Sequence, residues 1–227
     1  MNKLTTCFIA LSLLSFVHCD NAESGNSSIA KSRYGLKQAC IEYKITGDMV
    51  SGTEKLYFDR SGMREAKYSH QITKVMGITQ ENNTATFINF DEDGMIYTYD
   101  FKTKSGTKME NPLKEAFEKK DMKEVGKQML VQMGGKKIGT GKVLGKTCDI
   151  WEIASLGTKT WIWNWLNLKT VSNMMGMKMT IEATKISETF DKKKLQKPNV
   201  EYRDMGDVLK GFKGLDMDAL KKKYRKK

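Results

Sequence analysis

Apolar and polar side chains alternate along most of the chain, and this period of two limits the fold more than any other feature. In "CIEYKIT" (40–46), Ile41, Tyr43 and Ile45 alternate with charged or polar residues. A similar alternation runs through "GMKMTIEATKI" (176–186). Because neighbouring side chains of a strand point to opposite faces, both segments are predicted to be strands with one buried and one wet face.

Further segments show the same strand character. The sequence "DEDG" (91–94) lies between two of them and is typical of a hairpin turn. The chain is therefore predicted to be mainly β (α+β), built on a large antiparallel sheet. The other expected strands are 53–59, 64–77, 84–90, 95–104, 148–153, 158–163 and 168–172.

One amphipathic helix is expected between the strands. Asn111 can cap its start, Pro112 suits its first turn, and Gly134 with Gly135 ends it. A second, weaker helix is expected within 204–224. The apolar residues at helical spacing in the first helix are Leu113, Phe117, Val125, Met129 and Met133.

The N-terminus has the pattern of a secretory signal. Lys3 precedes "CFIALSLLSFV" (7–17), an apolar run too short to span a bilayer. Residues 1–19 are therefore expected to direct export, with a flexible tether at 20–33. Two fates remain open for Cys19, namely removal by cleavage after it or lipidation within the loose lipobox "FVHC". The protein is expected in the periplasm or as an outer-membrane lipoprotein.

Two cysteines, Cys40 and Cys148, follow the signal segment. Because oxidising compartments favour pairing, we expect a disulfide between them, with two buried free thiols as the alternative. His70 is the single histidine beyond the signal, so these residues cannot complete a convincing zinc site. No metal and no cofactor is expected.

The positive charge is concentrated at the C-terminus. The formal net charge is +12, and residues from Lys192 onward contain 13 Lys or Arg against 5 Asp or Glu. Lys221, Lys222, Lys223 and Arg225 could contact an anionic membrane surface. Nucleic acid is not expected as a partner of an exported protein, and a solvated terminus is the alternative.

Catalytic motifs are not recognisable. "GGKKIGTGKVLGKT" (134–147) imitates a phosphate-binding loop, but residue 140 is threonine where the motif needs glycine. The segment that follows reads as a strand and not a helix, so 134–147 is predicted to be part of a hairpin. No nucleophile elbow or metal helix appears, and we do not expect an enzyme.

The segments "GKVLGKTCDIWEI", "TKTWIWNWLNLKT" and "MKMTIEATKI" together resemble the second half of the lipoprotein-carrier (LolA/LolB-like) fold. "IEYKITGDMVSGTEKLYFDRSGMREAKY" is similar to uncharacterised bacterial envelope proteins thought to share it. The resemblance covers 34–190 and leaves 191–227 as a basic, partly helical tail. It implies a strongly curved sheet, a half-barrel, with the helix on its concave side.

The resemblance also implies a cup for an acyl chain or other apolar ligand, bound without catalysis. Ordinary core packing of the same residues is the alternative, and the protein would then be a ligand-free interaction module of the envelope. Trp165 is expected in an exposed turn, where it could contact a membrane or partner. The expected lining residues are Trp161, Trp163, Met175, Met177, Met179, Phe117 and Met129.

Overall fold

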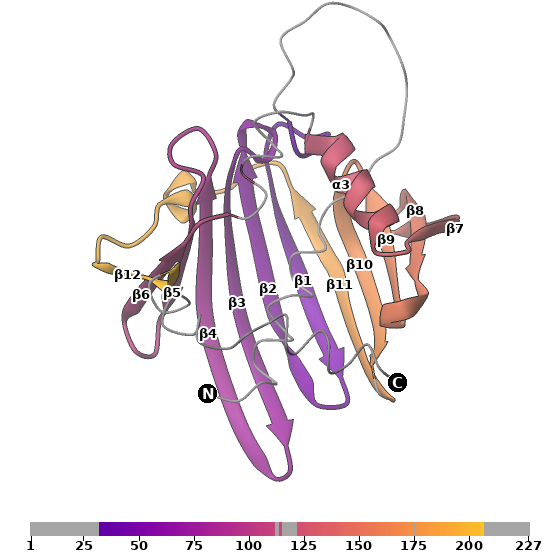
Figure 1. The fold of residues 1–227 in the computed structure, drawn as a ribbon, viewed down its shortest axis with the longest axis horizontal. Helices are drawn as coiled ribbons and strands as arrows, with labels where there is room; N and C mark the ends of the chain where they lie inside the picture. The colour runs from indigo at the N-terminus through magenta and orange to yellow at the C-terminus, as the bar shows by residue number, and fades with distance from the viewer. Residues whose placement is uncertain (1–31, 112–113, 115–121, 175, 207–227) are drawn as a thin grey trace, which may run out of the picture.

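The fold is one continuous curved β-sheet with an α-helix across one of its faces (Figure 1). The computed structural model describes residues 32–111, 114, 122–174 and 176–206. Twelve strands lie in the order β12-β6-β5-β4-β3-β2-β1-β11-β10-β9-β8-β7, and the two edge strands do not pair with each other. The sheet is therefore an open half-barrel of mainly β structure, which confirms the predicted fold class.

Adjacent strands pair antiparallel, except that β12 pairs parallel with β6. The elements are β1 (Ala39–Gly47), β2 (Val50–Asp59), η1 (Arg60–Gly62), β3 (Arg64–Val75), β4 (Ile78–Asn89), β5 (Ile96–Asp100), β6 (Ser105–Met109), α3 (Met122–Gln132), β7 (Lys136–Val143), β8 (Lys146–Ile153), η2 (Ala154–Leu156), β9 (Thr158–Trp163), β10 (Leu166–Met174), β11 (Met177–Ser187), η3 (Lys192–Leu195) and β12 (Tyr202–Asp204).

The register separates two faces of the sheet. On β1 and β11, Ile45 lies opposite Ile181, and Lys44 lies opposite Glu182. We call the face that carries Ile45 and Ile181 the inner face, and the face that carries Lys44 and Glu182 the outer face. The predicted alternation of β1 and β11 is confirmed, because apolar side chains share the inner face.

The helix α3 packs on the inner face. Leu130 of α3 is fully buried in one cluster with Ile41 and Leu56 of the sheet. The helix ends as predicted, because Gly134 adopts a positive φ of 80° and the N–H of Gly135 donates to the Leu130 carbonyl at 2.8 Å. The expected beginning of the helix, with Leu113 and Phe117, lies outside the described residues.

Tight turns join several of the strand pairs. Met76 and Gly77, Leu144 and Gly145, and Asn164 and Trp165 form two-residue loops in which both residues have positive φ. This conformation is that of a type I′ turn, whose twist matches that of the strands. The hairpin predicted within 134–147 is therefore confirmed as β7 and β8.

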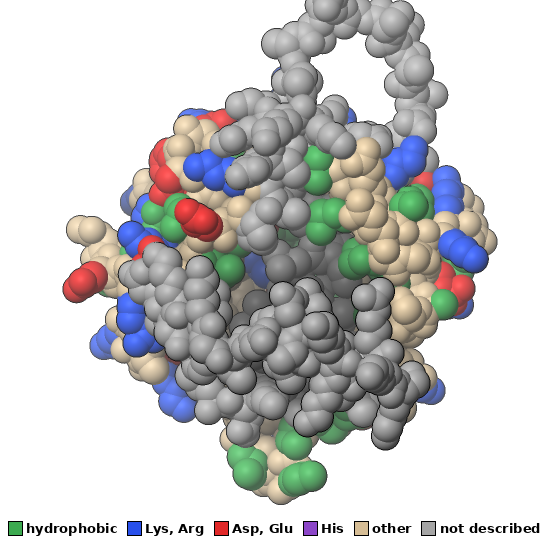
Figure 2. Space-filling view, viewed as in Figure 1, with side chains coloured by type: hydrophobic (Ala, Val, Ile, Leu, Met, Phe, Trp, Pro, Cys, Tyr) green, Lys and Arg blue, Asp and Glu red, His purple; other side chains and the backbone are tan. Residues whose placement is uncertain are grey.

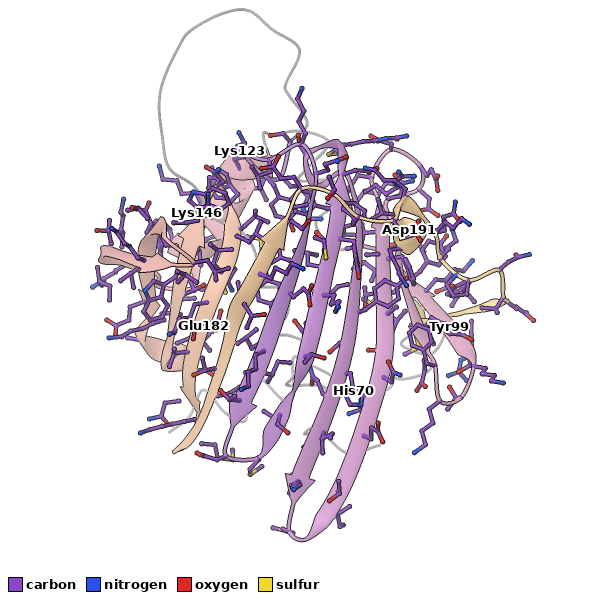
Figure 3. The ribbon with its side chains drawn as sticks, turned by 180° about the vertical axis from the view of Figure 1, so that it is seen from behind. His70, Tyr99, Lys123, Lys146, Glu182 and Asp191 are labelled. Atoms are coloured by element: carbon purple, nitrogen blue, oxygen red, sulfur yellow. The ribbon has the colours of Figure 1, made fainter. Side chains whose placement is uncertain are left out.

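The segment after β11 crosses the outer face, as Figure 3 shows from behind. Leu195 of η3 is buried against Phe87 and Ala85, and Phe190 packs on Tyr57. β12 then joins the sheet beside β6. Residues 202–204, which follow the domain boundary expected after residue 190, therefore belong to the same sheet as the residues before it. The second expected helix lies almost entirely outside the described residues.

The predicted disulfide is absent, because Cys40 and Cys148 are both free and buried. Cys40 lies on β1 and Cys148 on β8, with β11, β10 and β9 between them. Strands are about 4.8 Å apart, whereas a disulfide needs Cα atoms within about 7 Å. Burial raises the pKa of each thiol, so both favour the protonated form.

Candidate functional site

The inner face has an apolar and a polar sector. The apolar sector comprises β1, β11 and one end of β2, where Ile41, Ile45 and Leu56 are at most 4 % exposed. The polar sector lies on β3 and β4, whose register places hydroxyl and amide side chains on the same face. The polar inner-face residues include Ser69, Gln71, Asn82, Thr84 and Thr86.

Glu54 marks the boundary between the two sectors. It lies opposite Tyr43 on one side and Ser69 on the other, and it is 7 % exposed. The Ser69 hydroxyl and the Gln71 amide each donate to Glu54 Oε1 at 3.2 Å. Tyr43 donates to the Asn167 carbonyl at 3.0 Å, and burial raises the pKa of its phenol. The boundary therefore combines the Glu54 carboxylate, whose Oε1 accepts two hydrogen bonds, with the neutral phenol of Tyr43.

A buried ion pair closes the end of the inner face near the start of β3. Arg33 Nη1 lies 3.2 Å from Glu65 Oε2, and the Tyr34 hydroxyl donates to the same oxygen at 2.6 Å. The guanidinium also lies over the rings of Tyr34 and Phe90, at 5.2 and 5.3 Å from their centroids. Residue 33, expected at the end of a flexible tether, is instead 3 % exposed.

The structure places Trp161 and Trp163 on the outer face. Trp161 lies opposite Lys169, which in turn lies opposite the outer-face residue Glu182. Lys169 Nζ is 5.5 Å from the Trp161 ring centroid, and Lys146 Nζ is 4.8 Å from that of Trp163. The prediction that these two tryptophans line a cup on the concave side is therefore wrong, and both pack instead against the main core cluster, in line with the core-packing alternative. The inner positions of β9 are occupied by Thr158, Thr160 and Ile162.

Trp165 is buried, contrary to the expectation of an exposed turn residue. It is 4 % exposed and packs in the main core beneath α3. The reason is a long-range contact, because residues 33–36 run across the β9–β10 turn. The N–H of Gly35 donates to the Asn164 carbonyl at 2.9 Å. Trp165 is thus unavailable to a partner.

The expected methionine lining is divided between two ends of the sheet. Met179 is buried with Ile45 and Val50 near the end of β1, and Met177 is partly buried two residues earlier on the same strand. Met129 packs instead against Met63, which precedes β3 at the opposite end. Met175, Phe117, Cys19 and the cluster Lys221, Lys222, Lys223 and Arg225 lie outside the described residues.

The sequence did not reveal the exposed apolar tip of the β3–β4 hairpin. Met76 is 97 % exposed and Ile78 is 71 % exposed. This hairpin projects beyond its neighbours in Figure 1, and hydrophobic side chains cover its tip in Figure 2. The sequence pattern that could have indicated this tip is "VMGI" (75–78), in which apolar residues surround a two-residue turn. The tip is an apolar surface available for contact.

Two further features concern clusters of metal-ligating side chains and the length of helices. Among the described residues, no three His, Cys, Asp or Glu side chains gather in a way that could hold a metal ion. Within the same part of the chain, no helix has the length and apolar character needed to cross a membrane.

The solved structures to which this chain is similar include the following two proteins. One is an uncharacterised conserved protein from Thermus thermophilus, with a TM-score of 0.45, 9 % identity, and 74 % of this chain and 90 % of that one covered. The other is a DUF1329 family protein from Desulfovibrio piger, with a TM-score of 0.31, 11 % identity, and coverage of 71 % and 90 %. No family model and no curated protein matches the sequence. At TM-scores below 0.5, neither likeness identifies a function for this chain.

Proposed function

We propose that this protein is exported to the cell envelope and binds an acyl chain or other apolar ligand on its inner face, without catalysing a reaction. The observation that supports this best is the apolar sector of the concave face. There Ile45 and Ile181 lie side by side across β1 and β11, and Ile181 is only partly buried.

The adjoining polar sector suits a ligand with two unlike ends. An acyl chain on the apolar sector would gain about 0.8 kcal/mol per buried methylene, so ten methylenes offset roughly 8 kcal/mol of association costs. A polar end directed toward β3 would meet the Ser69 hydroxyl and the Gln71 amide beside Glu54. Hydrophobic burial and hydrogen bonding both hold a ligand without changing it, so the proposed function includes no catalytic step.

Native mass spectrometry of protein purified from its own envelope without detergent tests this proposal. The expected result is an adduct of lipid mass that is lost on organic extraction. A clean apo mass that persists after exposure to fatty acids and phospholipids would contradict the proposal.

A matched pair of variants locates the ligand. Ile181→Trp places a large ring on the inner face, whereas Glu182→Trp places the same ring on the outer face one residue later. We expect the first variant to abolish binding of a fluorescent fatty acid and the second to retain it. Equal binding by both folded variants would rule out the inner face as the site.

The exposed hairpin tip favours a second candidate function, an interaction module of the envelope. Met76 and Ile78 would bury their side chains against an apolar partner or a lipid surface, at roughly 1.5–3 kcal/mol each. Met76→Asp should then reduce sedimentation with phosphatidylethanolamine–phosphatidylglycerol vesicles. Leu144→Asp is the control, because Leu144 occupies the same position of a two-residue turn and is 44 % exposed. Unchanged sedimentation of Met76→Asp would exclude the tip as a lipid contact.

A further inference from the structure

A cavity lies on the outer face, away from the apolar sector of the inner face. Its volume is about 360 Å³, and it opens between strands β3 to β5 and the segment that follows η3. Figure 3 shows the chain running from Asp191, just before η3, toward the strand that carries Tyr99. The lining residues are Arg64, Phe87, Ile88, Asn89, Glu92, Asp93, Tyr97, Leu195, Gln196 and Lys197.

Arg64 provides a fixed cation at this cavity. Its Nε donates to Asp59 Oδ1 at 3.0 Å and its Nη2 donates to Asp59 Oδ2. Lys192 Nζ reaches the same Oδ2 at 3.2 Å. Burial alone would raise the pKa of Asp59, but the hydrogen bonds from Arg64 and Lys192 outweigh it and lower that pKa. The Nε and Nη2 atoms of Arg64 are thus held by Asp59, and Nη1 is left to donate to a ligand oxygen.

Two carboxylates in the β4–β5 turn provide the opposite charge. Asp93 accepts a hydrogen bond from the Tyr97 hydroxyl and another from the N–H of Met95 at 2.9 Å. The side chain of Glu92 is exposed, and its negative charge acts on Arg64, whose pKa is raised first by the hydrogen bond to Asp59 and further by Glu92. The lining therefore holds two cations, Arg64 and Lys197, and two carboxylates, Asp93 and Glu92.

The aromatic rings of the cavity are already covered. Lys197 Nζ lies 3.9 Å from the Tyr97 ring centroid, and Tyr202 packs edge-on against Tyr97 with centroids 5.0 Å apart. Phe87 is 3 % exposed. A sugar usually needs an open aromatic face on which to stack, so this lining argues against a carbohydrate ligand.

We propose that the outer cavity binds a small zwitterion, with its carboxylate on the Nη1 edge of Arg64 and its ammonium beside Glu92. The volume is at the lower end of ligand sites, which run from about 300 to 1,000 Å³, and so fits a molecule of amino-acid size. A ligand with one charge would be attracted by only one sign of the lining charges, whereas a zwitterion can place a charge of opposite sign beside Arg64 and beside Glu92. This site is independent of the inner-face proposal.

Isothermal titration calorimetry on the full exported chain tests the assignment. The probes are L-leucine and 6-aminohexanoate, which have short and long separations between their charges, each beside its carboxylate-only and amine-only analogue. We expect at least one zwitterion to bind about tenfold tighter than both of its analogues. The absence of binding by either zwitterion, or equal affinity for zwitterion and analogues, would overturn the proposal.

Two glutamate variants separate this site from a general charge effect. Glu92→Gln should remove the preference for the zwitterion over the carboxylate-only analogue. Glu188→Gln, at an exposed glutamate that does not line the cavity, should leave the preference intact. Binding that is unchanged in Glu92→Gln, or lost equally in both variants, would refute the role of Glu92. Because the Glu92 side chain is exposed, its replacement should not affect folding.

Discussion

Replacement of Trp165 measures how strongly the β9–β10 turn is held against the core. A tryptophan buries up to about 250 Å², which at about 25 cal/mol per Å² is worth roughly 6 kcal/mol. Trp165 is 4 % exposed, so nearly all of this area is removed from water. Large-to-small substitutions at such sites cost about 3–5 kcal/mol, and we expect Trp165→Ala to lower the free energy of unfolding by that amount.

The backbone at this position adds a second, separable effect. Trp165 has a φ of 67°, where a residue with a Cβ carries a penalty of about 1–2 kcal/mol that glycine avoids. Trp165→Gly removes the same ring and also relieves this strain. It should therefore be less destabilising than Trp165→Ala by about 1 kcal/mol, although glycine is usually the costlier substitution in regular structure.

Urea unfolding followed by far-ultraviolet circular dichroism gives both differences, with Trp163→Ala as the control. Trp163 is only partly buried, so its loss should cost less than the loss of Trp165. A cost below about 1 kcal/mol for Trp165→Ala would refute the burial argument. Equal stability of the Ala and Gly variants would refute the argument from the positive φ.

Two other predictions follow from local geometry. Met76→Asn should raise the free energy of unfolding by roughly 0.3–1 kcal/mol, because Asn tolerates the φ of 49° at this turn better than Met; a lower urea midpoint would contradict this. The second concerns Asp59, whose folded pKa is lowered by its cationic partners against the effect of burial. The stability that this carboxylate contributes is present above its unfolded pKa of about 3.9 and is lost as pH falls through the lower folded value. Asp59→Asn should therefore flatten the dependence of stability on pH below about pH 4, and an unchanged acid profile would contradict the assignment.

The sequence was sufficient to predict the position of the strands whose two faces differ in polarity. β1 and β11 were predicted within one or two residues, because charged residues alternate with apolar ones along both. β7 and β12 carried little apolar signal, since β7 is rich in lysine and glycine and β12 has three residues. Their place in the sheet depends on pairing with a neighbour.

The faces of β9 could not be predicted from its sequence. Hydrophobicity alone would direct Trp161 inward, yet Thr160 is the inward residue and is 1 % exposed. Its hydroxyl is satisfied there by Asn167 Oδ1 at 2.8 Å. The inward position of Thr160 and the outward position of Trp161 depend on the register with β10. A register is set by contacts between strands, so it cannot be read from the alternation of apolar and polar residues along either strand. The same holds for Trp165, whose burial requires residues 33–36.

The pairing of β1 with β11 sets the order in which the molecule can be completed. Cys40 lies opposite Ser187, so the middle of the sheet joins the first long strand to the last. During synthesis, at roughly 5–20 residues per second, β1 has one unpaired edge for on the order of ten seconds before β11 emerges. Strand β1 also carries the apolar side chain of Ile41, which is fully buried in the folded protein, so the incomplete sheet exposes an apolar face beside its unpaired edge. A protein assembled in this way leaves a strand edge unpaired for longer than one whose neighbouring strands follow each other along the chain.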